Sequence, residues 1–257
     1  NNDISSMGTG TGILLKGANT TANIHHNNAS IHGFAIGVDV DGGNATINNN
    51  HIYNNGIGIR MNNGGNGTVT SNKFFDVLKN GTDLQIGSLS GSVNAANNNW
   101  FAGSNFGVEN LSLSGIDATS NYWNASNGPG VVGPGSGSKI TNKVSYCPFL
   151  NDVPIIFGGS GIPTSPNVTI LISENSGIPN DGTICNGSTV SLDATTVGAL
   201  DYEWSNGSTL SNITVSPILT SSYTVTVSFD GCDVIKSTSI QVNPSPSCMI
   251  TGASGPV

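Results

Sequence analysis

The sequence predicts an all-β protein in which a right-handed parallel β-helix, a kind of solenoid, is followed by a β-sandwich. Two observations lead to this prediction. The first 150 residues carry a motif that returns every two dozen residues or so, which is typical of a solenoid. The part after residue 166 carries short alternating runs of apolar and polar residues between turn residues, which is typical of a sandwich.

The repeated motif of the first half is an Asn, a variable residue and then a large apolar residue. We expect the Asn side chains to lie above one another on successive coils, where each amide can bond to the next, as in the Asn ladders of stacked sheets. The predicted ladder consists of Asn27, Asn50, Asn72, Asn98 and Asn121.

Apolar doublets accompany this motif with the period-two spacing of a strand that has one buried face. A leucine-rich repeat is the alternative at this period, but the repeats are rich in Asn, Gly, Ser and Thr, which are poor helix formers. We therefore expect a β-helix over residues 1–150, cut at its N-terminal end in an already running coil. The doublets are Ile13/Leu15, Ile36/Val38, Ile59/Met61, Leu84/Ile86 and Leu111/Leu113.

Charge is sparse along the whole chain. Only 9% of the 257 residues are charged, and the formal net charge is −8. No basic stripe is present that could contact phosphates, so we expect no binding to nucleic acid. No segment approaches 18 consecutive apolar residues, so we expect no insertion into a membrane.

Asp39 and Asp41 are the one close pair of acids in the first half. Before Gly42 they could belong to a calcium loop, but no further oxygen ligands are evident nearby, so we expect no cofactor. We expect Asp39 to be a surface partner of Lys16, one coil away. Surface positions rather than a metal site are also expected for His25, His26, His32 and His51.

Catalysis on polysaccharides is the main enzymatic alternative for a β-helix. Hydrolysis needs two carboxylates at one cleft, and lyase or epimerase chemistry needs a base with a cation or Arg. Asp76 and Asp83 flank an excursion where a groove could form, and Arg60 is the only Arg of the first half. Because no recognised constellation appears, we expect no enzyme; a polysaccharide lyase, hydrolase or epimerase remains the alternative.

Tyr53, Phe75 and Phe101 follow the apolar position of three successive motifs and are expected to form a vertical row. Exposed, such a row could stack on sugar rings and would indicate carbohydrate binding. Buried, it would be one of the aromatic stacks that fill solenoid interiors. We favour burial.

The chain contains four cysteines. Cys185 and Cys232 bracket the predicted sandwich, and we expect a disulfide between them in a chain with an extracellular composition. Two buried free thiols are the alternative. Cys147 is expected to be a buried thiol, with pairing to Cys248 as another possibility; the partner of Cys248 could also lie in a missing part.

Two segments resemble known families. Asn121-Tyr122-Trp123, Asn127-Gly128-Pro129-Gly130 and the exit Val144-Ser145-Tyr146-Cys147-Pro148-Phe149-Leu150 resemble the last coil of β-helix regions in large bacterial secreted and cell-surface, adhesin-like proteins. Thr183-Ile184-Cys185-Asn186-Gly187, Tyr202-x-Trp204 and Tyr223-Thr224-Val225-Thr226-Val227 resemble Ig-like and PKD-like modules of secreted bacterial proteins.

These resemblances imply an extracellular or bacterial cell-surface protein with a β-helix (1–150), a linker (151–166), an Ig-like module (167–244) and the start of a further module (245–257). The expected function is a non-catalytic stalk or adhesion scaffold. Its expected partners are further modules of the same polypeptide, and surface glycans or other copies of itself. The alternatives are a carbohydrate-binding or polysaccharide-degrading β-helix and a filament-forming surface protein.

Overall fold

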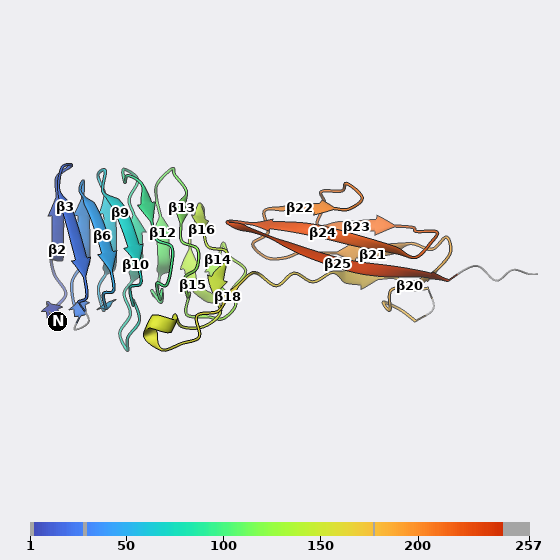
Figure 1. Cartoon of the computed structure of the whole chain (residues 1–257), viewed down its shortest axis with the longest axis horizontal. Helices are drawn as coiled ribbons and strands as arrows, with labels where there is room; N and C mark the ends of the chain where they lie inside the picture. Colours follow the sequence, from blue (N-terminus) through green and yellow to red (C-terminus); the bar gives the residue numbers. More distant parts are fainter. Residues whose placement is uncertain (1–2, 28–29, 177, 244–257) are drawn as a thin grey trace, which may run out of the picture. The chain divides into compact units, whose positions relative to one another are not determined.

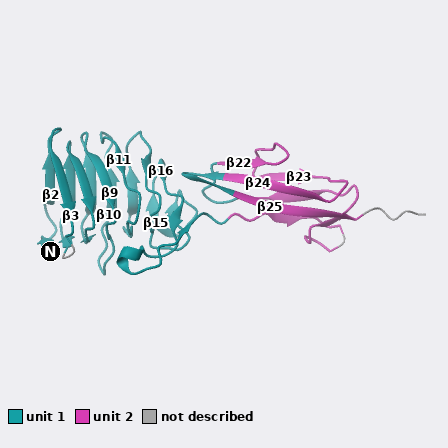
Figure 2. Ribbon diagram, viewed as in Figure 1, with its two compact units in different colours: residues 1–167, 196–200, 228–234 teal, residues 168–195, 201–227, 235–257 magenta. Residues whose placement is uncertain are grey.

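The computed structural model describes residues 3–27, 30–176 and 178–243, and their regular structure is β-strand apart from one short 3-10 helix, η1 (Ile155–Phe157). The chain divides into two compact units (Figure 2). The first contains the residues up to 167 together with 196–200 and 228–234. The second contains the rest. Cys248 and the predicted further module lie outside the described residues.

The first unit is a parallel β-solenoid of about six coils, which follow one another from blue to green in Figure 1. Each of the early coils adds one strand to each of three sheets, because the chain visits the sheets in turn. The seven-stranded sheet has the spatial order β14 (Pro129–Val131), β15 (Gly137–Ile140), β12 (Phe106–Asn110), β10 (Thr82–Ile86), β8 (Ile57–Asn62), β5 (Ile36–Asp41) and β2 (Thr11–Lys16).

The other two solenoid sheets are built from the shorter strands of each coil. The three-stranded sheet has the order β1 (Asp3–Ser5), β4 (Ser30–His32) and β7 (Ile52–Tyr53), and single bridges continue it over the later coils. The six-stranded sheet has the order β16 (Val144–Ser145), β13 (Ile116–Asp117), β11 (Val93–Asn94), β9 (Asn66–Thr70), β6 (Asn44–Asn48) and β3 (Thr21–His25).

The vertical registry confirms the predicted solenoid, although some doublets are displaced. Ile47 pairs with Ile24 and with Val69 on the neighbouring coils. In the seven-stranded sheet, Val38 and not Ile36 lies opposite Ile13. The coil that follows Leu84 supplies Val108, whereas the predicted doublet Leu111/Leu113 is exposed. The predicted doublets are therefore out of register there, because turns of unequal length take up the variation between coils.

One corner of every coil is set by a residue in the left-handed conformation. The residues are His26, Asn49, Ser71, Asn98 and Ser120, with φ values of 55°, 53°, 57°, 61° and 56°. Non-glycine residues adopt this conformation uncommonly, and Asn tolerates it better than most. The residue that follows each of them turns its side chain inward and forms the ladder.

The ladder of buried Asn side chains runs through Asn27, Asn50, Asn72, Asn99 and Asn121. At each step the amide oxygen of one Asn accepts bonds from the backbone N–H and the side-chain amide of the Asn one coil earlier; Asn72 Oδ1, for example, lies 3.1 Å from both Asn50 nitrogens. Four predicted members are confirmed. Asn98 is wrong by one residue, because it is the left-handed corner residue and Asn99 is the ladder member.

A column of large apolar side chains lies inside the same corner. The Phe74 and Phe101 rings stack at 5.3 Å, and Phe101 stacks on Trp123 at 4.9 Å. All three are fully buried, so Phe101 belongs to the interior. The shift of the ladder by one residue also turns Trp100 outward, although the motif predicts it inside. The column consists of Ile31, Ile52, Phe74, Phe101 and Trp123.

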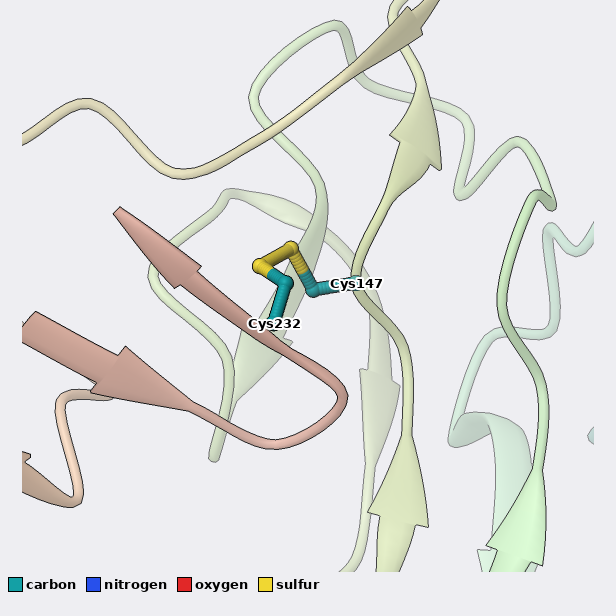
Figure 3. Close-up of a disulfide and its surroundings, with 2 residues drawn as sticks. All are labelled: Cys147 and Cys232. Carbon is teal, nitrogen blue, oxygen red and sulfur yellow. A yellow bond between two sulfur atoms is a disulfide. The ribbon is translucent and has the colours of Figure 1, made fainter. Parts of the chain in front are cut away.

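The disulfide joins Cys147 to Cys232 (Figure 3), and Cys185 is an exposed free thiol. The predicted Cys185–Cys232 bridge is therefore wrong. The tip of a hairpin, residues 228–234, belongs to the first unit, and Asp230 O accepts bonds from the N–H groups of Tyr146 and Cys147. Gly231, with φ of 105°, permits this approach, because a Cβ there would lie 2.5 Å from Cys147 O.

Residues 151–166, predicted as a linker, belong to the first unit as well. The strand β17 (Phe149–Leu150) pairs antiparallel with β18 (Pro163–Thr164), and η1 lies between them in sequence. This return fixes the segment against the last coil.

The second unit contains two small sheets and has its own buried side chains, among them Trp204, Val225 and Val227. One sheet has the order β19 (Leu171–Ser173), β21 (Val190–Asp193) and β23 (Asn212–Val215), all antiparallel. The other has the order β20 (Thr183–Cys185), β25 (Cys232–Asn243), β24 (Ser221–Phe229) and β22 (Asp201–Trp204).

Candidate functional site

A groove of about 410 Å³ lies on the outside of the solenoid, between the left-handed corners of the early coils and η1. This volume falls within the range of small-molecule sites, which combine apolar walls with a few placed polar groups. We refer to it as the corner groove. Its lining residues are His26, Asn49, Asn50, His51, Lys73, Ile156 and Phe157.

His51 is held in one orientation at the corner groove. Its Nε2 lies 3.1 Å from Asp76 Oδ2 and 3.1 Å from the backbone oxygen of Phe75. Burial, followed by the positive charge of Lys73, lowers the pKa of His51, so the ring is neutral at pH 7. Because both neighbours of Nε2 are acceptors, Nε2 carries the proton and Nδ1 is an acceptor.

Lys73 lies in register with His51 on the next coil. Its Nζ stands 5.5 Å from the centre of the Trp100 ring, within the range of a cation–π interaction. No carboxylate of the described residues forms an ion pair with it. The groove thus contains a cation that lacks a counter-charge among the residues that the structure describes.

The aromatic residues of this face stack on one another. Tyr53 stacks on His32 at 5.0 Å, and Phe75 stacks on Trp100 at 4.7 Å. The predicted row of Tyr53, Phe75 and Phe101 does not exist as one row, because Phe101 is buried in the interior. Side chains in register along a solenoid meet face to face, and this contact covers ring faces that a sugar would need. Sequence reasoning also missed Phe157, which lies 6.4 Å from Trp100 and follows no repeat.

The excursion between Asp76 and Asp83 does not bring these two acids together. Asp76 contacts His51, whereas Asp83 is fully buried and accepts bonds of 2.6 Å from the N–H groups of Ala102 and Gly103. Asn80 also donates to Asp83. Asp83 therefore binds backbone N–H groups of the next coil, which is a structural role.

A polar groove of about 200 Å³ does lie beside this excursion. Ala102 and Gly103 line it, together with Lys79 and Lys139, and they separate it from the buried Asp83 carboxyl. None of the residues that line it is an acid. This arrangement lacks the pair of acids that hydrolysis needs.

Asp83 should make the stability of the solenoid depend on pH. Burial raises the pKa of Asp83 to about 8, against the three bonds that favour its charged form. The folded state then binds the proton more tightly than the unfolded state, so the free energy of unfolding falls as pH rises from about 4 to about 8.

The test compares the wild type with Asp83→Asn, whose amide oxygen can still accept both backbone bonds. Urea unfolding between pH 5 and pH 8 should show an extra loss in the wild type of about 1 kcal/mol per pH unit at the steepest point. Parallel curves for the two proteins would show that Asp83 does not titrate in this window.

Asp39 is occupied by a different partner from the predicted one. Arg60 Nε and a terminal nitrogen lie 3.0 and 2.6 Å from the two Asp39 oxygens, and the Asp39 carboxylate is almost buried. Lys16 lies opposite Asp41 instead. Within the described part of the chain, no three His, Cys, Asp or Glu side chains gather closely enough to hold a metal ion.

No helix among the described residues is long and apolar enough to cross a membrane. Comparison of the chain with protein-family models, with curated proteins and with solved structures finds no match.

Proposed function

We propose that this chain is a non-catalytic structural and adhesion segment of a large extracellular protein, in which the solenoid carries binding loops on a stiff support. The observation that supports this proposal best is the unbroken ladder from Asn27 to Asn121. Displacing one coil from the next would leave buried amides without partners, and each such group costs about 1–3 kcal/mol. A ladder of this kind resists bending and local opening.

The Cys147–Cys232 disulfide supports an extracellular location, since disulfides persist in oxidising compartments and are rare in the cytosol. It also joins residues 228–234 to the last coil of the solenoid, where Tyr146, Phe149 and Leu150 are buried. The resemblance of this last coil to β-helix regions of bacterial surface proteins favours a bacterial surface or secreted protein as the parent.

We assign the second unit the role of an Ig-like spacer between the solenoid and further modules of the same polypeptide. Its two sheets, of three and four strands, and the buried Trp204 support this assignment. An extracellular spacer needs stability but no active site. This unit has a core of its own, and side chains along its strands alternate in burial.

The non-catalytic proposal is tested by incubating the purified chain with polygalacturonate, alginate and hyaluronan. We expect no release of unsaturated or reducing ends above that of a heat-denatured sample. Release of new chain ends from any of the three polymers would identify the chain as a polysaccharide-degrading enzyme.

The support role is tested separately by limited proteolysis followed by mass spectrometry. We expect the ladder-bearing coils to resist a protease at concentrations that cut the loops at 76–79 and 178–181, which lie outside the ladder. Early cuts within the strands β5 to β12 would contradict a stiff support.

A further inference from the structure

We propose that the corner groove binds a carboxylated saccharide, a chain of uronic acid residues, with Lys73 as the partner of the sugar carboxylate. This inference rests on the adhesive half of the proposed function and names its ligand class. It concerns a different set of residues from the aromatic row that the sequence suggests, because the groove combines an unpaired cation, polar corner side chains and the wall formed by η1.

The charge of the groove favours an anionic ligand. The chain has a net charge of −8, yet the lining of the groove includes the cation Lys73 and no acid. Asp76 is in contact with the lining residue His51, and its carboxylate is engaged by His51 Nε2 and by the N–H of Val77. Lys73 therefore keeps its charge available for a ligand, and charge-assisted hydrogen bonds are about twice as strong as neutral ones.

The spacing of the groove favours a repeating saccharide over a single small anion. His26 and Asn49 occupy equivalent corners of successive coils, and His51 and Lys73 are paired on neighbouring coils. Successive coils are about 4.8 Å apart, the spacing of paired strands, which is close to the length of one pyranose residue in a chain. A saccharide lying along the solenoid axis could thus place successive residues against polar side chains of successive coils.

The remaining groups suit a sugar rather than a peptide. Asn49 offers an amide that can both donate and accept, and His51 Nδ1 can accept from a hydroxyl. Ile156 and Phe157 form an apolar wall opposite these polar groups. Phe157 comes from η1 and not from a coil, so its ring lies at 43° to Trp100 and is not covered by a parallel neighbour. Pyranose rings have the same division into an apolar face and a hydroxyl-bearing rim.

The test is a calorimetric titration of the full chain with a trisaccharide of galacturonate and with its methyl ester. We expect the acid to bind and the ester to bind at least about tenfold more weakly, because the ester lacks the charge that Lys73 meets. Lys73→Gln should weaken binding of the acid by a similar factor, and so should Asn49→Gly, which keeps the left-handed corner but removes the amide. Lys16→Gln is the matched control, since it makes the same charge change on an exposed strand position outside the groove.

Equal affinity of the acid and the ester, or equal affinity of Lys73→Gln and Lys16→Gln, would overturn the proposal. Absence of binding to the wild type would overturn it as well. The support role is judged on other evidence, because the melting temperature and the protease resistance of the same samples report on the ladder and not on the groove.

Discussion

Asn99→Ala is expected to lower the free energy of unfolding of the solenoid by about 3–5 kcal/mol, a large effect for one substitution. Asn99 Oδ1 accepts bonds from the N–H and the side-chain amide of Asn72, and its Nδ2 donates to Val69 O at 2.8 Å. Alanine leaves the buried N–H of Asn72 without this acceptor and removes the amide donor from Val69 O, whereas the Asn72 amide keeps its bonds to Ile47 O and Thr70 O. Chemical denaturation monitored by circular dichroism measures the loss.

Asn98→Gly is the matched control for this substitution. Asn98 has φ of 61°, which glycine adopts without strain, and its side chain is not part of the ladder. We expect a change of no more than about 1 kcal/mol. A larger loss of unfolding free energy for Asn98→Gly than for Asn99→Ala would indicate that Asn98, as the sequence predicts, is the ladder member. It would contradict the ladder through Asn99.

The second large effect is expected from Cys147→Ser combined with Cys232→Ser. The disulfide closes a loop of 85 residues, and on the chain-entropy model its loss costs about 4.5 kcal/mol of unfolding free energy. Differential scanning calorimetry of the double variant should therefore show a lowered transition for the unit that contains the solenoid.

Cys185→Ser is the control for the disulfide. Cys185 is exposed and free, so this variant should unfold like the wild type. A non-reducing peptide map should contain a linked pair from around residues 147 and 232. A linked pair from 185 and 232, with a destabilised Cys185→Ser variant, would contradict the structure.

The solenoid itself could be predicted from sequence because the residues that stabilise it recur once in every coil. An inward Asn every coil and an apolar column beside it leave a signal that needs no knowledge of the turns. The exact registry was harder to predict, because Asn98 and Asn99 are consecutive and both fit the motif, with Trp100 or Phe101 as the apolar residue. The left-handed corner residue decides between them, and Asn is favoured at that position too.

The disulfide and the corner groove could not be predicted, because each depends on a contact that leaves no periodic signal. Cys232 meets the last coil through a hairpin tip far along the chain, whereas the sequence shows only that Cys185 and Cys232 bracket a set of strands. The groove needs η1, which lies in a segment of linker-like composition. The outward turn of Trp100 follows from the shift at Asn99, and it removed Phe101 from the predicted aromatic row.

The most direct test of the stacked coils is disulfide trapping between their outward-facing positions, in a Cys185→Ser background. Thr46 and Thr68 are exposed and are paired on neighbouring strands β6 and β9, so cysteines introduced there should form a bond readily on mild oxidation. Cysteines at positions 46 and 70 are offset by two residues and should not. The expected result is efficient disulfide formation between positions 46 and 68 and little between 46 and 70. No disulfide between 46 and 68, or equal formation in both pairs, would contradict the stacking of the coils in this register.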